Sequence, residues 1–389
     1  MISPGAESKS EVGSRKSEVV RPEHGSARAD AATQSGHFPL PISHFPLPVR
    51  VVFLGTPEFA VPSLRALHAS PQIDVALVVT QPDRPAGRGR RLTPSAVKAF
   101  ALEHDLPVFQ PERLRGAEAL ERLRAADADL FVIAAYGQIL RQAVLDIPRH
   151  GCLNVHPSLL PRHRGSSPIA AAILAGDERT GVTIMLTDRG MDTGPILTQE
   201  ALPLGREETT ASLTPRLADF AANLLLRTVP GWIAGDIAPR PQDEGSATLS
   251  RLFTKEDGAI DWSRPAVELE RQVRALNPWP RAYTFANGKR LLVLLAHATD
   301  DAVARIPGTV FAGPGKALLV ATGAGALRLE LVQPEGGRET SGPQFLGTNA
   351  GLLGVRLGRA WRSRSSGSSG RTSRWPRNRS FLSRTAGRS

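Results

Sequence analysis

Short apolar runs alternate with segments of helical periodicity along residues 50–236. Between the runs, apolar residues recur every three or four positions, as they do on one face of a helix. Strands that are apolar on both faces belong to parallel sheets covered by helices, so we expect an α/β fold with a doubly wound, Rossmann-like sheet. The expected strands are 50–55, 75–80, 129–135, 151–155, 181–187 and 196–202, and the expected helices begin at Thr56-Pro57 and span 92–105, 116–125, 167–175 and the segment holding Leu213, Leu217, Phe220 and Leu224.

A second pattern begins after residues 237–248, which we interpret as a linker. Beyond an expected helix at 265–276, the chain has short β-like runs separated by Gly-rich turns. This pattern is typical of a small barrel, so we expect a C-terminal β-barrel of the OB type. The predicted domains are therefore 49–236 and 249–349, and the expected barrel strands are 282–286, 290–296, 308–312, 317–321 and 326–332.

Both ends of the chain differ in composition from these domains. Residues 1–48 are rich in Ser, Gly, Pro and Ala with alternating charge, and residues 350–389 are rich in Arg, Ser and Gly. Such compositions cannot bury enough apolar surface to fold, so we expect a disordered extension and a disordered basic tail. A start codon placed too early, or a tail that is not the natural one, would leave the same pattern.

The net charge of +11 is concentrated in the tail. From Val355 onward there are ten arginines and no acid, and the first 49 residues hold five residues of each sign, so residues 50–354 carry only +1. Nucleic-acid binding by the two domains would therefore depend on local patches. The single cysteine excludes a disulfide framework, and no run of 18 apolar residues exists that would predict a membrane helix.

Candidate catalytic residues lie at two expected strand ends. Asn154 and His156 are two residues apart, so their side chains point to the same side of the strand, and Pro157 ends it. Asp192 lies between two glycines just after another strand. An amide, an imidazole and a carboxylate can serve as oxyanion donor, acid or base, and orienting group. A hydrogen-bonded structural histidine would give the same pattern.

The sequence lacks the motifs of several common kinds of catalytic and nucleotide-binding site. There is no G-x-S-x-G, no H-E-x-x-H, no Walker A and no G-x-G-x-x-G, and Cys152 lies inside an apolar strand. His156 and His163 are seven residues apart across a proline-bounded turn, a poor pair for a metal. We therefore expect no metal site, and non-covalent acyl or one-carbon transfer, or simple hydrolysis, remains.

A Gly/Pro-rich loop at residues 81–91 follows a strand on the expected ligand side. Guanidinium groups match phosphate oxygens, so the loop suits a phosphate-rich partner, although a solvated loop has the same composition. Its four arginines are Arg84, Arg88, Arg90 and Arg91.

Segments spread over residues 50–346 resemble the methionyl-tRNA formyltransferases. The motifs Asn-x-His-Pro-Ser-Leu-Leu-Pro and Asp-Thr-Gly are similar to those shared by formyltransferases that use 10-formyltetrahydrofolate, and the Arg-rich loop and Asn277-Pro278-Trp279-Pro280 resemble the tRNA enzymes. The matching segments are FLGTPEFAVPSL (53–64), TQPDRPAGRGRRLTPSAVK (80–98), LPVFQPERLR (106–115), AAYGQIL (134–140), CLNVHPSLLPRHRGSSPI (152–169), GVTIMLTDRGMDTGPIL (181–197) and IDWSRPAVELERQVRALNPWPRAY (260–283).

This resemblance implies transfer of a formyl group from N10 of 10-formyltetrahydrofolate to the amino group of methionyl initiator tRNA, for translation initiation. The Asn154 amide and a protonated His156 would stabilise the tetrahedral oxyanion, and Asp192 would orient His156 and raise its pKa. The implied folate pocket comprises Ser158, Leu159, Leu160, Pro161, Tyr136, Gly137 and Gln138. The implied tRNA contacts are Arg84, Arg88, Arg90, Arg91, Arg281, Lys289 and Arg290.

The resemblance also implies a monomeric, non-membrane protein of the cytoplasm, with the mitochondrial matrix left open. His163 departs from it, because the tRNA enzymes usually have Trp there and formyltetrahydrofolate hydrolases and dehydrogenases tend to have His. The alternatives that keep this chemistry but change the acceptor are a formyltetrahydrofolate hydrolase, which His163 favours, or an amino-sugar formyltransferase. From a different class, the basic tail favours a non-catalytic RNA-binding protein.

Overall fold

A computed structural model describes residues 48–86, 91–300 and 304–358 of the chain. All of them fall within one of the two units into which the chain divides, residues 45–389. The expected disordered extension, and the tail from residue 359 onward, lie outside the described residues.

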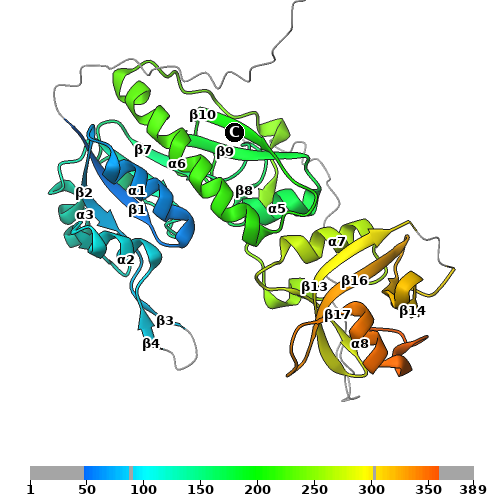
Figure 1. Ribbon diagram of the computed structural model, residues 1–389. Helices are drawn as coiled ribbons and strands as arrows, with labels where there is room; N and C mark the ends of the chain where they lie inside the picture. Colours follow the sequence, from blue (N-terminus) through cyan, green and yellow to red (C-terminus); the bar gives the residue numbers. More distant parts are fainter. Residues whose placement is uncertain (1–47, 87–90, 301–303, 359–389) are drawn as a thin grey trace, which may run out of the picture. The chain divides into compact units, whose positions relative to one another are not determined.

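A seven-stranded sheet forms the centre of the first domain (Figure 1). Five neighbouring strands are parallel. At one edge, β9 pairs antiparallel with β7, and β10 pairs antiparallel with β9. All five parallel strands therefore end on the same side. The order is β10 (Ile196–Pro203), β9 (Arg179–Leu186), β7 (Cys152–His156), β6 (Leu130–Ala134), β1 (Val49–Gly55), β2 (Ile73–Val79) and β5 (Val108–Phe109).

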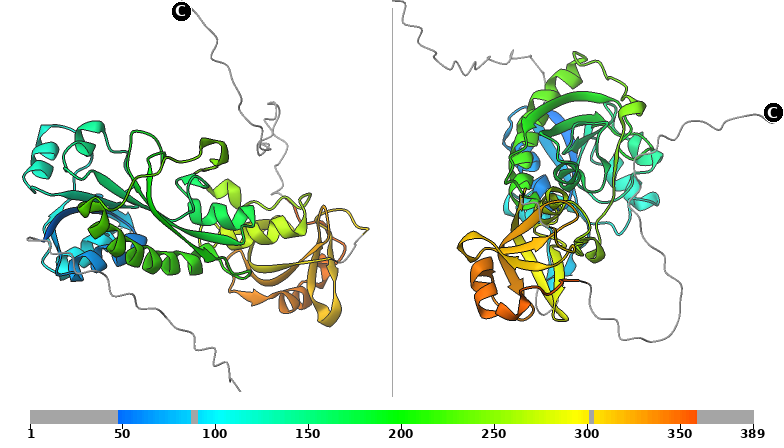
Figure 2. Two further views of the ribbon diagram at one scale, coloured as in Figure 1. Left: turned by 90° about the horizontal axis from the view of Figure 1, so that it is seen from above. Right: turned by 90° about the vertical axis from the view of Figure 1, so that its right-hand side faces the viewer.

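Helices cover both faces of this sheet, as the view from above shows (Figure 2). Alternate residues of β1 explain the two layers, because Val51 and Phe53 are buried against α1, α2, α5 and α6, whereas Val52 and Leu54 are buried against α3 and α4. The helices are α1 (Val61–Ala69), α2 (Ala96–Glu103), α3 (Ala117–Arg124), α4 (Gln142–Leu145), α5 (Pro168–Ala175) and α6 (Thr210–Ala234). The prediction of a doubly wound, Rossmann-like sheet is confirmed.

The second domain is a curled antiparallel sheet with its own apolar core, consistent with the expected OB-like barrel. Helices α7 (Ala266–Ala275) and α8 (Gly342–Thr348) accompany it. Its strands are β12 (Ala282–Ala286), β13 (Lys289–Thr299), β14 (Val310–Ala312), β15 (Leu318–Ala321), β16 (Ala326–Pro334) and β17 (Thr340–Ser341), with β12 and β14 at the two ends of the order.

Residues 355–358 bridge those two ends. Val310 N donates to Val355 O at 2.9 Å, and Phe285 N donates to Gly358 O at 2.9 Å. Leu352 and Leu357 are both 3% exposed within this core. Leu352 and Leu357 therefore belong to the core of the second domain, although the sequence placed the start of the disordered tail at residue 350; three leucines in the nine residues 350–358 gave no clear signal.

Two helix starts differ from the sequence-based expectation. Residues 91–93 form a strand, β4, paired with β3 (Arg84–Ala86), so the helix expected at 92–105 begins at Ala96. Its N-cap is Ser95, whose hydroxyl accepts from Lys98 N. Thr56-Pro57 begins only a short 3₁₀ turn (η1, Glu58–Ala60), and α1 begins separately at Val61, with Pro62 in its first turn, where proline fits.

Candidate active site

Asn154, His156 and Asp192 come together at the carboxyl end of β7. Asn154 Nδ2 donates to Asp192 Oδ1 at 3.2 Å, and His156 Nδ1 lies 3.6 Å from Asp192 Oδ2. The pairing of β7 with β9 brings the two segments side by side, with Asn154 opposite Met185. The residues that the sequence singled out are thus neighbours, and their roles in a reaction stay a prediction.

The loop that carries Asp192 is tightly folded. Asp192 has a φ of +57°, in the left-handed region that non-glycine residues rarely adopt. A Cβ on Gly194 would lie 1.8 Å from the carbonyl oxygen of Leu186, so only glycine fits there. The backbone N–H of Gly165 donates to Asp192 Oδ2 at 2.8 Å. The carboxylate is therefore fixed from several sides before any ligand binds.

The hydrogen bonds of His156 identify its tautomer. Nε2 lies 3.1 Å from the carbonyl oxygen of His163, which can only accept, so Nε2 carries the hydrogen. In the neutral ring Nδ1 is then bare and faces Asp192. Burial lowers the pKa of His156 below its usual value, while the charge of Asp192 opposes that change. A neutral ring of this tautomer has Nδ1 available to accept a proton, and the protonated ring that the resemblance implied stays a prediction.

The side chain of His163 points to a different partner. Its Nε2 lies 2.7 Å from Asp177 Oδ2, and Arg162 also pairs with Asp177 at 2.5 Å. These residues line a second pocket of about 190 Å³. His163 thus contributes its carbonyl to His156 and commits its ring to Asp177.

The expected folate turn packs against the sheet through its own polar groups. The buried Ser158 hydroxyl donates to Arg162 O at 2.6 Å, and Leu160 N donates to Thr183 Oγ1 at 3.2 Å. Leu159 and Pro161 are partly exposed. The Ser158 side chain therefore stabilises the turn, and a ligand would meet its backbone and the flanking apolar groups.

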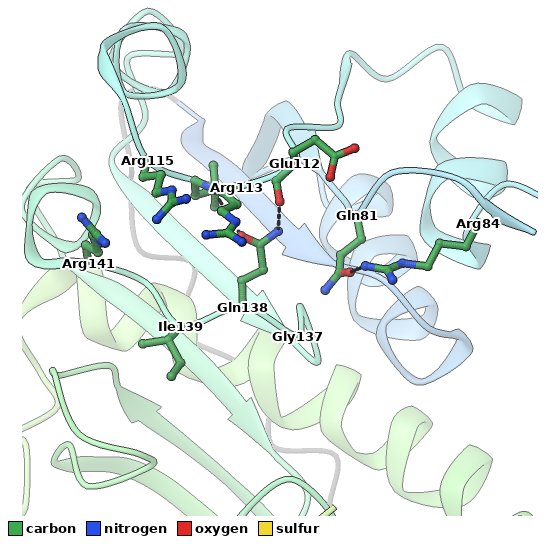
Figure 3. A pocket seen from close by; sticks show the side chains of 10 residues that line it. Gln81, Arg84, Glu112, Arg113, Arg115, Gly137, Gln138, Ile139 and Arg141 are labelled. Carbon is green, nitrogen blue, oxygen red and sulfur yellow. Dashed lines mark hydrogen bonds between the residues drawn. The ribbon is translucent and has the colours of Figure 1, made fainter.

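A pocket of about 340 Å³ lies beside the carboxyl ends of β2 and β6 (Figure 3). Gly137 and Gln138 line it, and Gln138 Nε2 donates to Glu112 O at 3.2 Å. Tyr136 is only 1% exposed, and its carbonyl accepts from Thr56 and Gln81. Tyr136 thus lies behind the residues that line the pocket and holds Thr56 and Gln81 through its carbonyl. The sequence did not single out several other lining residues, among them Arg113, Arg115, Ile139 and Arg141.

The expected tRNA contacts fall into two groups. Arg84 lies on the β3–β4 hairpin and lines the same pocket, where its Nη2 donates to Gln81 Oε1 at 2.9 Å. Arg88 and Arg90 lie outside the described residues, as does the side chain of Arg91. Arg281 immediately precedes β12, whereas Lys289 and Arg290 begin β13, where Arg290 lies 4.1 Å from the ring centroid of Tyr283.

Two polar residues near Asp192 escaped the sequence analysis. Gln242, in the segment expected to be a linker, donates to the carbonyls of Asp192 and Gly194. Arg164, 4% exposed, donates to Gln242 and Glu244. A buried arginine needs a partner, but the sequence does not reveal a partner about 80 residues away.

The described residues contain no group of three or more His, Cys, Asp or Glu side chains that could hold a metal ion. Within the same ranges no helix is long and apolar enough to cross a membrane.

Comparison with protein families gives two matches. The formyl transferase model matches residues 49–229, and the model of the formyl transferase C-terminal domain matches residues 252–349. Among curated proteins, the chain is 50% identical to methionyl-tRNA formyltransferase of Methylococcus capsulatus, over 80% of this chain and 100% of that protein. It is 49% identical to the one of Chloroflexus aurantiacus, with the same coverage.

Solved structures show the same fold at low identity. An N-formyltransferase from Helicobacter canadensis, in complex with folinic acid and dTDP-3-aminofucose, has a TM-score of 0.54 at 16% identity and covers 72% of this chain and 98% of that one. HypX from Aquifex aeolicus, in complex with tetrahydrofolic acid, has a TM-score of 0.50 at 19% identity and covers 81% of this chain and 50% of that one.

Proposed function

The chain belongs to the formyl transferase family, and we propose that it transfers a formyl group from 10-formyltetrahydrofolate to the α-amino group of methionyl initiator tRNA, for translation initiation. The observation that carries the proposal is the Asn154–His156–Asp192 cluster at the end of β7, in a chain about 50% identical to methionyl-tRNA formyltransferases along their whole length. We place the reaction in the cytoplasm, since the relatives are bacterial proteins.

The cluster suits attack of a neutral amine on a formyl carbon. An amine gives up a proton as it forms the C–N bond, and the bare Nδ1 of His156 is positioned to take it, directly or through a water molecule. The imidazolium that results faces the Asp192 carboxylate, which stabilises it. The Asn154 amide has a second N–H that would donate to the oxyanion. Collapse then passes the proton to N10 of the leaving tetrahydrofolate.

Two surfaces would bind the substrates. The folate would lie against Ser158–Pro161 and the pocket of Gly137 and Gln138, since both flank the end of β7. The acceptor stem would meet Arg84 and the hairpin loop, and the tRNA backbone would meet Arg281, Lys289 and Arg290. Binding through phosphate contacts weakens steeply as the salt concentration rises. Added salt should therefore weaken tRNA binding much more than folate binding.

Transfer of labelled formyl from 10-formyltetrahydrofolate to methionyl initiator tRNA tests the proposal. We expect label in acid-precipitable RNA, and none with uncharged tRNA. Formate released at the same rate with or without tRNA would identify a hydrolase, and label on an amino-sugar nucleotide but not on tRNA would identify a sugar formyltransferase. RNA binding without formation of formylated tRNA, formate or a formylated amino-sugar nucleotide would favour the non-catalytic RNA-binding protein.

A further inference from the structure

The side chain of Gln242 joins the segment that follows α6 to the loop carrying Asp192. Its Nε2 donates to the carbonyl oxygen of Asp192 at 2.8 Å and to that of Gly194 at 2.7 Å. One amide therefore uses both of its N–H groups on carbonyls at either side of Thr193. This contact grips the loop by its backbone, immediately beside the carboxylate that faces His156.

Gln242 is itself held in one orientation. Arg164 Nε donates to Gln242 Oε1 at 3.0 Å, so the oxygen of the amide faces the guanidinium and the NH₂ group faces the loop. The two terminal nitrogens of Arg164 donate to the Glu244 carboxylate at 2.9 and 2.7 Å. Arg164 is 4% exposed, so its geometry is set by these partners rather than by water.

The same elements hold the Asp192 carboxylate. Gly165, next to Arg164, donates its N–H to Asp192 Oδ2 at 2.8 Å. The two-residue strand β8 (Arg164–Gly165) pairs in parallel with β11 (Leu249–Ser250). Asp192 therefore has two contacts that depend on residues 240–250. Gln242 binds its carbonyl directly, and Gly165, whose strand pairs with β11, binds its carboxylate.

We propose that Gln242 is a positioning residue that holds the Asp192 carboxylate opposite Nδ1 of His156. This inference rests on the proposed function. The left-handed backbone of Asp192 costs free energy and persists only where its surroundings impose it. The two donors of Gln242 supply that constraint. Without them the loop relaxes, the carboxylate moves away from the imidazole, and proton transfer from the amine slows, while both substrate surfaces stay intact.

Replacement Gln242→Met tests this role, because Met has a similar length but no hydrogen-bond donor. The matched control is Gln272→Met, since Gln272 Nε2 also donates to two backbone carbonyls, of Asp257 and Ala259, but in the second domain. We expect kcat of Gln242→Met to fall about tenfold or more, with KM for both substrates within about twofold. The control keeps its kcat, even if its Tm falls equally.

A double-mutant cycle with Asp192→Asn separates positioning from general loosening. If Gln242 acts through Asp192, Gln242→Met lowers kcat much less in the Asp192→Asn background than in the wild type. Equal factors in the two backgrounds overturn the inference. Gln242→Glu, which keeps the acceptor for Arg164 and loses the donors, takes the place of Gln242→Met in the same cycle if the methionine variant does not fold.

A measurement that needs no turnover keeps this inference separate from the proposed function. Titration of His156 by NMR should give a lower pKa in Gln242→Met than in the wild type, because a displaced Asp192 no longer favours the imidazolium. An unchanged pKa contradicts the positioning role. A wild-type enzyme that titrates as expected but forms no formyl-methionyl-tRNA would instead contradict the proposed function.

Discussion

The imidazole of His156 donates from Nε2 to the carbonyl oxygen of His163, 3.1 Å away, and this contact leaves Nδ1 free opposite Asp192. The bond fixes the tautomer of a neutral ring. Under the proposed function, the carbonyl of His163 thus decides which ring nitrogen takes the proton of the amine.

Replacement Asn154→Ala should lower kcat by about 10²–10³-fold, because loss of one oxyanion donor typically has that effect. Steady-state formylation of methionyl initiator tRNA measures it. Asn223→Ala is the matched control, since Asn223 is an exposed asparagine of α6 whose amide donates to the backbone carbonyl of Asp219. Normal turnover of Asn154→Ala would remove Asn154 from the mechanism.

The free energy of unfolding should depend on pH through the protonation of His156. Burial lowers its pKa in the folded protein, so the unfolded chain binds more protons as the pH falls through the ordinary histidine range. The contribution of neutral His156 to the free energy of unfolding is therefore complete above the pKa of the unfolded chain, about 6.5. It is lost as the pH falls toward the pKa of His156 in the folded protein.

Thermal unfolding at pH 7.5 and 5.5 tests this sign. Wild-type protein should lose more Tm between the two pH values than His156→Gln, which has no titrating ring. Equal losses would mean that His156 has the same pKa folded and unfolded.

The ring of His163 should have no part in hydrolysis. Because its Nε2 is committed to Asp177 at 2.7 Å, we expect formate release without tRNA to stay at background in the wild type. His163→Gln should keep formyl transfer within about threefold, since its backbone carbonyl still accepts from His156. Formate release that depends on the His163 imidazole would restore the hydrolase interpretation.

Replacement Gly194→Ala should disrupt the Asp192 loop. The new Cβ would lie 1.8 Å from Leu186 O, so the loop must shift. We expect a destabilisation of about 1–3 kcal/mol and a kcat at least about tenfold lower. Gly347→Ala is the control, because no atom lies within 4 Å of its Cβ position. Calorimetry and initial rates on both variants check the difference.

Replacement Arg88→Ala should weaken use of tRNA and leave folate affinity unchanged. Arg88 lies outside the described residues, so this expectation rests on the Arg-rich sequence. If Arg88 contacts one phosphate, the salt dependence of tRNA binding should fall by about one in log–log slope. Arg122→Ala, on the exposed face of α3, should change neither quantity. Equal losses toward both substrates would contradict a tRNA contact.

The elements of the first domain were predictable where one signal dominates. The runs around Val52, Val78 and Val132 are buried on both faces, so their composition alone identifies central strands. Leu92 misled because local propensity is weak evidence: this exposed leucine belongs to a hairpin rather than to a helix face. Two-residue strands such as β8 and β11 have too few residues to show any period.

The site was predictable as far as it lies along one strand. Alternation along β7 placed Asn154 and His156 together. Strand direction does not explain the position of Asp192, because β9 runs antiparallel to β7 and its carboxyl end lies beside the amino end of β7. The proton on Nε2 could not be foreseen, since it depends on the carbonyl of His163. The Gln242 contact depends on a separation of 50 residues, and such pairings are set by the folded chain rather than by local pattern.

The pairing of β8 with β11 also sets an order of events during synthesis. Chains emerge from the ribosome N-terminus first, and domains generally fold as units. The seven-stranded sheet is complete once Pro203 has emerged, yet Arg164 and Gly165 have no strand partner until Leu249 and Ser250 follow. The loop that carries Asp192 therefore acquires its final supports about 50 residues after its sheet, and the second domain closes only when Gly358 arrives. Translation itself thus postpones completion of the candidate active site until the second domain has begun to emerge.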